Sequence, residues 1–429
     1  MITSAEKQDP LAGIDDIDWS SYEDAYGPAT NTPKDLRALA SRDEEQVDNG
    51  QSTLYGTIYH QGSRYTASPL AVPFLIRIVA DPESLKRSRV IYYIILLAVG
   101  HFSPTVIDIA GIRKRLEDFR KKTPEEYKAG LQAWVDAAPS EGLKSVREIE
   151  VDFMTHGKTL KRLEAELATY DAARKGLPVM LELCHDPNPE IRMAALFFLA
   201  WFPEDSEASV AVLKTVLKAE NETPTIVATA ILGLSFLSKK EDSAIKDGIR
   251  PFLSSTESWI EWATAMALIS LGESDSAVID STVKYLGQEP TSSNEELNFV
   301  PFLTDTTVSA YTASYIRMIP NCETLVGSAV IAELAKLEKF QFTEMSAAVL
   351  GMLFGEYYRQ GEGGKTVLPP FEELTPNQRE VVRLCARADG WCWSYANWCP
   401  MLGDFGLPGR PDKMREYAGI EKPQWVDQP

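Results

Sequence analysis

The stretch LPVMLELCHDPNPEIRMAALFFLAWF, residues 177–202, decides the fold. It contains two apolar runs of helical character, joined by the turn Asp186-Pro187. An earlier stretch, VPFLIRIVADP at residues 72–82, repeats its first half, with proline in second place and Asp-Pro at the end. A helix pair that recurs along a chain indicates a repeat array, because one pair cannot bury both its faces and must stack on its neighbours.

The second helix of each pair carries an apolar triplet that returns in steps of 35 residues, with a fourth copy at matching internal spacing. Positions i, i+3 and i+4 form one helix face, and the small first residue lets a neighbouring helix approach closely. The copies are Ala195, Phe198 and Leu199; Ala230, Gly233 and Leu234; Ala265, Leu268 and Ile269; and Ala348, Gly351 and Met352.

Four Thr-Pro pairs mark helix starts, because a capping hydroxyl precedes proline at the first helical position. These pairs are Thr32-Pro33, Thr123-Pro124, Thr223-Pro224 and Thr375-Pro376. The second and the fourth also have the spacing of a capping box, with Glu126 and Gln378. Strand signals are nearly absent, with neither an Asn-Gly hairpin nor a βαβ rhythm. The sequence therefore predicts an all-α fold, a right-handed α-solenoid with a helical insert and a C-terminal cap.

The opening stretch resembles a HEAT-type repeat, in the divergent form also called PBS-lyase-like. The resemblance rests on Asp186-Pro187, on Ile191-Arg192 and on Ala194-Ala195. It covers about residues 66–100 and 172–275 and weakens through 276–360, and Val227 and Glu261 replace the arginine in the next two repeats. The resemblance implies a solenoid of HEAT-like helix pairs and, usually, a binding role, but it implies no single chemistry.

Breaks in the pattern divide the chain into five expected parts. These are an acidic, aromatic N-terminal arm at 1–31, HEAT-like helix pairs at 32–100, a charged helical insert at 101–172, HEAT-like repeats at 173–360, and a loop with an aromatic, Cys-rich cap at 361–429. A basic cluster from Arg113 to Lys122 lies in the insert. We interpret it as a solvated helix face with acidic neighbours, and an anion-binding patch is the alternative.

The composition of the 429-residue chain restricts its partners. Its 43 basic and 62 acidic residues give a net charge of −19, which disfavours nucleic acid and anionic membranes as partners. Its most apolar window, Val90–Val99, is shorter than the roughly 20 residues of a membrane span and predicts a buried helix. The five cysteines suggest no disulfide framework, and the start resembles no signal peptide. We therefore expect a cytoplasmic protein.

The C-terminal cap concentrates cysteines and aromatic residues. Cys385, Cys392 and Cys399 are seven residues apart, which would place them on one face of a helix, although Gly390 makes one unbroken helix doubtful. We expect core cysteines and no metal site. Trp391 and Trp393 belong to an aromatic cluster that either seals the end of the array or lines a groove, and sealing is favoured.

The candidate binding residues cluster around YHQGSRY at residues 59–65. We expect His60 in the last turn of a helix, where Gly62 would be the C-terminal glycine. The alternative is a groove at which His60, Gln61 and Tyr65 display hydrogen-bonding groups. The full set of candidate binding residues is His60, Gln61, Tyr65, Trp19, Tyr22, Trp391 and Trp393.

No catalytic motif or nucleotide-binding loop appears, so no catalytic residue and no cofactor are expected. The sequence favours a non-catalytic interaction or scaffold protein that binds a protein partner through its concave face, and the acidity favours a basic partner. The alternative is an enzyme or an accessory protein of a biosynthetic pathway, similar to HEAT-like lyases, that acts on a small molecule. A DNA glycosylase is disfavoured by the charge.

Overall fold

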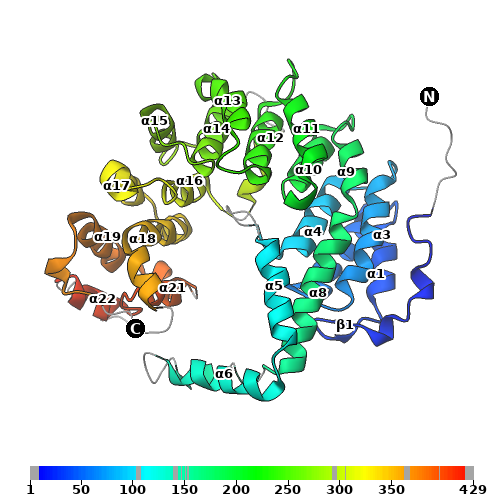
Figure 1. Ribbon diagram of the computed structural model, residues 1–429, viewed down its shortest axis with the longest axis horizontal. Coiled ribbons are helices and arrows are strands. Elements are labelled where there is room, and N and C mark those ends of the chain that lie inside the picture. The colour runs from blue at the N-terminus through cyan, green and yellow to red at the C-terminus, as the bar shows by residue number, and fades with distance from the viewer. Residues whose placement is uncertain are drawn as a thin grey trace. The chain divides into compact units, whose positions relative to one another are not determined.

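The computed structural model consists almost wholly of helices (Figure 1). It describes residues 9–102, 108–138, 144–145, 147–149, 151, 154–291, 297–304, 306–361, 368–395 and 397–420. Sheet in this described part is confined to two small antiparallel hairpins. They pair β1 (Glu23–Asp24) with β2 (Gly27–Pro28), and β3 (Tyr59–His60) with β4 (Ser63–Arg64). The all-α prediction is therefore confirmed.

The chain forms two compact units. Unit 1 comprises Met1–Ala133, Glu148–Leu237 and Phe299–Phe302, and unit 2 comprises Trp134–Arg147, Ser238–Asn298 and Leu303–Pro429.

The α-helices of unit 1 follow both hairpins and the 3₁₀ turns η1 (Ile14–Asp16) and η2 (Trp19–Ser21) in the structure. They are α1 (Thr32–Leu39), α2 (Glu44–Thr57), α3 (Ser68–Ala80), α4 (Arg87–Val99), α5 (Ile109–Arg120), α8 (His156–Arg174), α9 (Leu177–Leu183), α10 (Pro189–Leu199), α11 (Ser206–Val216) and α12 (Pro224–Leu237). The turn η3 (Pro203–Asp205) precedes α11, and α6 (Pro124–Asp136) begins in unit 1.

Unit 2 contains the helices of the second half. They are α13 (Ser243–Ile249), α14 (Ser258–Ser270), α15 (Ser276–Lys284), α16 (Val308–Ile316), α17 (Cys322–Leu334), α18 (Lys339–Gly361), α19 (Pro376–Arg387), α20 (Gly390–Ser394), α21 (Trp398–Asp404) and α22 (Pro411–Tyr417). Its 3₁₀ turns include η4 (Arg250–Ser254) and η7 (Phe371–Glu373), and η6 (Pro301–Leu303) begins in unit 1.

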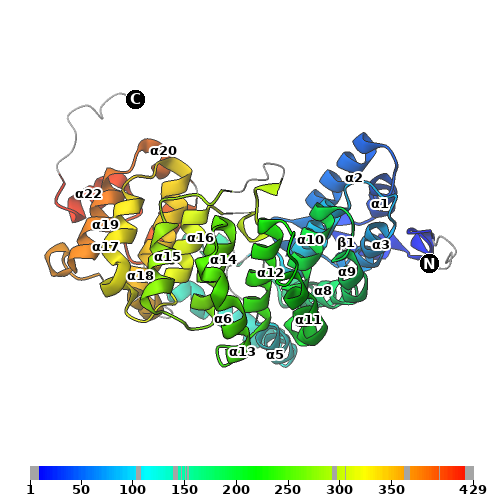
Figure 2. The same cartoon turned by 90° about the horizontal axis from the view of Figure 1, so that it is seen from above.

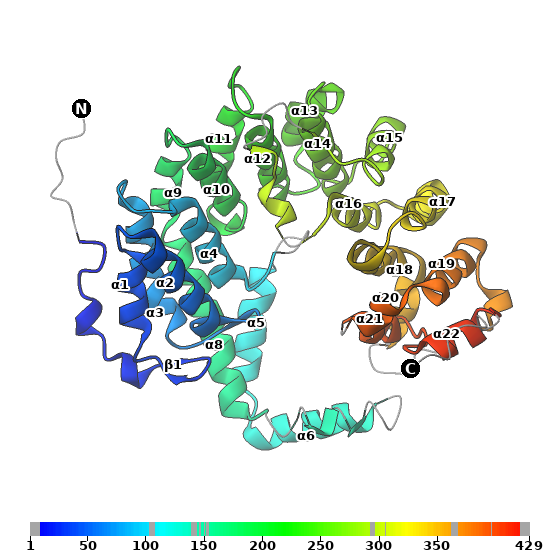
Figure 3. The same cartoon turned by 180° about the vertical axis from the view of Figure 1, so that it is seen from behind.

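Each unit is built from stacked helix pairs. In unit 1, α4, α10 and α12 pack in one row (Figure 1). Helices α9 and α11 pack beside this row (Figure 2). In unit 2, α14, α16 and α18 form the corresponding row, and α15, α17 and α19 lie beside it. Helix α8, from the segment expected to be an insert, packs against α3 and α4 (Figure 3). This stacking is that of a helical solenoid, and the right-handed superhelix stays a prediction.

The repeated triplets lie in the core. Ala195, Ala230 and Ala265 are fully buried, and Ala348 is nearly so. The rows are covered on more than one side, since every residue of α12 from Thr225 to Phe236 is buried. Part of this cover is aromatic: the ring centroid of Phe302 lies 4.7 Å from that of Phe197 and 4.9 Å from that of Phe236.

Arginine–acid pairs join successive repeats of unit 1. They link Arg42 to Asp81 at 2.6 Å, Arg87 to Asp186 at 2.9 Å and Arg192 to Glu222 at 2.8 Å. The Arg87–Asp186 pair is largely buried and connects residues on either side of the segment 101–172. We call these three pairs the arginine ladder. The Asp186-Pro187 turn is therefore a structural joint between helix pairs.

Three of the four Thr-Pro starts are confirmed, because α6, α12 and α19 begin at the proline. Both predicted capping boxes, Thr123 with Glu126 and Thr375 with Gln378, are present. At the first pair the prediction is wrong by one residue. Helix α1 begins at Thr32 itself, after Asn31, and its start has no side-chain cap.

The basic cluster of the insert forms ion pairs, as its interpretation as a solvated face requires. Arg113 contacts Asp171 at 2.6 Å, and Arg120 contacts Glu164 at 2.8 Å. Val90–Val99 lies within α4, whose residues are mostly buried. Among the described residues we find no helical stretch with both the length and the apolarity that a bilayer crossing requires.

Candidate functional site

His60 does not lie at a helix end, and this prediction is wrong. Helix α2 ends at Thr57, and His60 is the last residue of strand β3. Gln61 and Gly62 form the tight turn to β4, with φ angles of 50° and 83°. Two successive residues with positive φ are the signature of a type I′ hairpin turn, whose twist matches that of the paired strands. Gly62 thus supplies a left-handed conformation, but for a hairpin and not for a helix C-terminus.

The hairpin of β1 and β2 is bound to the same region by backbone hydrogen bonds. The Ala67 amide donates to the Glu23 carbonyl at 3.1 Å, and the Glu23 amide donates to Thr66 Oγ1 at 2.7 Å. The Ala25 amide donates to the Thr57 carbonyl at 3.1 Å. The two hairpins are therefore held side by side in unit 1, although they are far apart in sequence.

Four side chains gather where the hairpins meet, and we call Asp24, Tyr26, His60 and Tyr65 the hairpin patch. Tyr26 is 76% exposed, and its ring centroid lies 5.8 Å from that of His60. The Tyr26 amide donates to Asp24 Oδ1 at 2.8 Å, which fixes the turn that carries the ring. Partial burial raises the pKa of Tyr65, and the nearby Tyr26 and Asp24 add to this effect. Tyr65 therefore keeps its phenolic proton as a hydrogen-bond donor.

The patch has a rigid foundation at Arg64. Its guanidinium is largely buried, donates to the Gly62 carbonyl and lies 3.9 Å from Glu166 of α8. Gly100 leaves the space for it, because a Cβ there would lie 2.1 Å from Arg64 Nη1. Burial lowers the pKa of Arg64 from its ordinary value. The β3–β4 turn is thus tied to α8 and to the end of α4.

The other candidates near the N-terminus have different surroundings. Trp19 is buried, donates from its indole to the Ile14 carbonyl at 2.9 Å and packs near Phe74. Tyr22 is half-buried, and its backbone pairs with Trp19 and Ala29. Gln61 is exposed at the tip of the β3–β4 turn, beside the patch. Burial makes Trp19 a packing residue, and the binding roles of Tyr22 and Gln61 stay predictions.

The tryptophans of the C-terminal cap lie in unit 2, whereas His60 lies in unit 1. Trp393 packs edge-on against the buried Trp398 at 4.7 Å. Trp398 is fixed by a 2.9 Å hydrogen bond to Ser346 Oγ. Trp391 is 40% exposed and stacks on Tyr395. Trp398 therefore lies in the core of the cap with the half-buried Trp393 against it, and binding roles for Trp391 and Trp393 stay predictions.

The three cysteines of the cap do not share a helix face, contrary to the spacing argument. Cys385 lies in α19, Cys392 in α20 and Cys399 in α21, because the chain leaves the helix after Arg387 and restarts at Gly390. Burial raises the pKa of the Cys385 and Cys392 thiols to about 12. Within the described part of the chain, no cluster of His, Cys, Asp and Glu has the arrangement of a metal site.

A depression of about 920 Å³ lies in unit 1, where α5, α8, α9 and α11 approach each other. It is lined by an ion-pair network, in which Arg113 contacts Asp171 and Glu204 and Arg174 contacts Glu204 and Asp205. Both arginines already have partners, so their charges are not available to a ligand, although Lys175 also lines the depression.

The sequence reasoning missed Asp24 and Tyr26 as a pair at one turn. The available signal was DAYG at residues 24–27, because Asp at the start of a turn and Gly at its end are typical of β-turns. Within the arm, the buried Trp19 packs near Phe74 of α3. Tyr26 instead points its ring into solvent beside His60.

Comparison with known proteins identifies one repeat directly. The family model described as HEAT repeat matches residues 177–200, which span α9 and α10. No curated protein matches the sequence. A crystal structure of an engineered protein aligns over 91% of this chain and 97% of its own, with 16% sequence identity and a TM-score of 0.25. That score is too low to define a shared arrangement, so the HEAT-repeat solenoid rests on the family match and on the stacked helix pairs.

Proposed function

We propose that this HEAT-repeat helical solenoid is a non-catalytic interaction protein that binds a basic protein partner through the hairpin patch. The observation that carries the proposal is Tyr26, a large aromatic side chain that is 76% exposed on an ordered turn. Tyrosine is enriched among the residues that dominate binding energy in protein interfaces. A ring held in place before binding costs little conformational entropy when a partner covers it.

The chemistry of the patch fits a cationic side chain of the partner. A lysine or arginine can lie over the Tyr26 ring and pair with the adjacent Asp24 carboxylate, while Tyr65 offers a hydroxyl. The net charge of −19 favours approach of a basic partner from a distance. A cation–π contact and a carboxylate partner together favour a basic segment over a neutral one.

The concave-face prediction is less well supported in unit 1. Helices α10 and α12 are buried almost all round, and the chain's own Phe302 packs on Phe197 and Phe236. A partner that used this row would first have to displace those aromatic contacts. The hairpin patch needs no such rearrangement.

Site-specific photo-crosslinking tests the proposal. A benzophenone amino acid in place of Tyr26 should crosslink to one basic protein in a native extract, and the same probe in place of Tyr55 should not. Tyr55 is the matched control, because it is also an exposed tyrosine of unit 1. The affinity of the purified partner should then fall about 30-fold in Tyr26→Ala, the effect of a typical hot spot. Unchanged affinity in both Tyr26→Ala and Asp24→Asn would contradict the proposal.

A further inference from the structure

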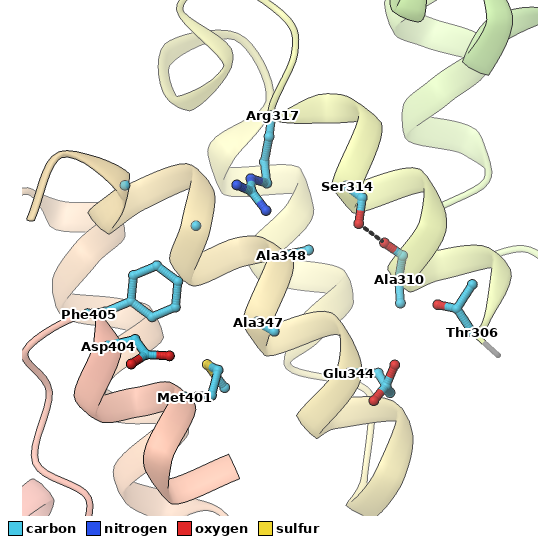
Figure 4. A pocket seen from close by; sticks show the side chains of 12 residues that line it. Thr306, Ala310, Ser314, Arg317, Glu344, Ala347, Ala348, Met401, Asp404 and Phe405 are labelled. Carbon is cyan, nitrogen blue, oxygen red and sulfur yellow. Dashed lines mark hydrogen bonds between the residues drawn. The ribbon is translucent and has the colours of Figure 1, made fainter. Parts of the chain in front are cut away.

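A second site of different chemistry lies in unit 2, between α16, α18 and α21 (Figure 4). It is a pocket of about 610 Å³, within the range of about 300–1,000 Å³ that is usual for ligand sites. The figure shows Arg317 on the α16 side, Met401 and Asp404 on α21, and Phe405 directly after α21. All its lining residues belong to unit 2, so the pocket is independent of the hairpin patch.

The space exists because small residues line one face of α18. Ala347, Ala348, Gly351 and Gly355 follow each other at helical spacing along the pocket. Ala310 of α16 also lines it. Large side chains at these positions would fill the space between the helices.

Among the lining residues that the structure describes, Arg317 is the only cation. It follows the last turn of α16, and its guanidinium makes no hydrogen bond or ion pair with any residue in the described part of the chain. Its guanidinium lies directly over Gly351, where an added Cβ would be 2.8 Å from Cζ. The conformation of this arginine therefore depends on a glycine, and its charge is available to a ligand.

The acidic residues of the pocket limit the charge of that ligand. Glu344 and Asp404 also line the pocket, so two carboxyl groups accompany one guanidinium. Asp404 is largely exposed to solvent. Neighbouring protein atoms remove part of the water around its carboxyl group, and this desolvation raises its pKa. A phosphate dianion would be repelled by the Asp404 carboxylate in the same pocket. A ligand with one carboxylate and a positive group nearby complements both Arg317 and Asp404.

We propose that this pocket binds the C-terminal carboxylate of a peptide segment, with Arg317 as its partner and with a basic residue upstream facing Asp404. Capture of a terminal carboxylate is a recurring mode of peptide recognition, and a planar guanidinium can hold both its oxygens. Met401 and Phe405 supply apolar surface for the last side chains of the peptide. This site goes beyond the proposed function, because it concerns a separate surface and a different recognition chemistry.

The test uses two synthetic libraries of tetrapeptides, each with lysine at the first position and all residues at the other three. One library ends in a free carboxylate and the other in an amide. Binding to the full chain is measured by affinity selection, and the selected peptides are then titrated by calorimetry. We expect selected members from the carboxylate library and at least tenfold weaker binding of their amidated forms. Selection of no carboxylate peptide would overturn the proposal.

Two matched variants locate the binding. Arg317→Gln should weaken binding of the selected peptides at least tenfold. Arg383 lies in α19 with a partly exposed side chain, and Arg383→Gln should leave binding unchanged. Gly351→Ala should weaken binding by displacing the guanidinium. Gly390→Ala should bind as the parent does, because Gly390 does not line the pocket and its added Cβ meets no atom within 4 Å. Peptide binding that survives both Arg317→Gln and Gly351→Ala would show that the pocket is not the site.

Competition with inorganic phosphate tests whether the pocket binds a phosphate group instead of a peptide carboxylate. It should not compete with the selected peptides at millimolar concentration, because the Asp404 carboxylate lines the same pocket and repels a dianion. Competition that is lost in Arg317→Gln would assign the pocket to phosphate and overturn the peptide assignment. If the peptide proposal for this pocket fails, the proposed function of the hairpin patch is not affected, since Tyr26 lies in unit 1.

Discussion

Helix α12 and the two hairpins at Tyr26 and His60 lie in the same unit, but different interactions hold them in place. Every residue of α12 from Thr225 to Phe236 is buried, so its position is set by packing on all sides. The hairpins have two-residue strands, and backbone hydrogen bonds and left-handed turn residues fix them. Packing produces the stable array, and the hairpins present side chains to solvent.

This difference predicts where substitutions act on stability and where they act on binding. Loss of volume or added volume in the α12 region should change the free energy of unfolding strongly. Changes in the hairpins should have smaller effects on stability and should alter partner binding instead. Substitutions that range from the buried core to the exposed hairpins should show this contrast between stability and binding.

The largest effect is expected for Phe302→Ala. Phe302 is buried against Phe197 and Phe236, and its removal leaves a cavity that typically costs about 3–5 kcal/mol. Urea denaturation followed by circular dichroism measures this cost. Phe299→Ala is the control, because Phe299 is 39% exposed, and it should change stability by less than about 1 kcal/mol. Equal losses in the two variants would show that Phe302 does not belong to the core.

A substitution to a larger residue in α12 should be the next most damaging. Ala230 is fully buried at a close helix contact, so Ala230→Leu should destabilise the protein by about 1–3 kcal/mol. The exposed Ala129 of α6 provides the matched control, and Ala129→Leu should be nearly neutral. A melting temperature of Ala230→Leu equal to that of the parent would show that the assigned repeat face is wrong.

The turn of the second hairpin should respond to loss of its glycine. Gly62 has a φ of 83°, and a side chain in this left-handed region costs about 1–2 kcal/mol. Gly62→Ala should therefore lower the urea midpoint. Gly56→Ala in α2 should raise it slightly, because Gly56 is helical and its added Cβ meets no atom within 4 Å. Shifts of the same sign would contradict the assigned turn.

The smallest effect on stability is expected for His60→Asn. Only its aromatic contact with Tyr26 is lost, which is worth at most about 1 kcal/mol. Because His60 belongs to the hairpin patch, partner binding should weaken while the melting temperature stays within about 2 °C of the parent. His185→Asn, at an exposed histidine of the same unit, should change neither quantity. A large loss of stability without a loss of binding would place His60 in a structural role.

The sequence predicts the solenoid because the same helix-packing pattern recurs several times along the chain. Ala195, Ala230 and Ala265 recur at one spacing, and each is fully buried, so every copy supports the same interpretation. The hairpins lack such support, because strands of two residues are too short to show an alternating pattern. Gln61-Gly62 also departs from the Asn-Gly pair that usually marks a type I′ turn.

The candidate site is predicted only in part for the same reason. His60 and Tyr65 are identified by their residue types, but their neighbours Asp24 and Tyr26 come from a distant part of the sequence. Contacts of this kind depend on the tertiary fold. The cap shows the opposite error, since equal spacing of Cys385, Cys392 and Cys399 suggests one helix, and the break before Gly390 separates them.

The arginine ladder also makes the order of the repeats matter. In the first repeats of the array an arginine meets an acid of the next helix pair, whereas at Glu261 the polarity is reversed and a carboxylate meets Lys284 and Tyr285 at 2.6 and 2.7 Å. If the Glu261 repeat were moved into the place of the Arg192 repeat, two carboxylates would face each other at Glu222. An unpaired charge at a partly buried joint is costly, so the repeats are not interchangeable parts. Duplication or exchange of single repeats in such a gene would succeed only with compensating charge changes at both neighbouring joints.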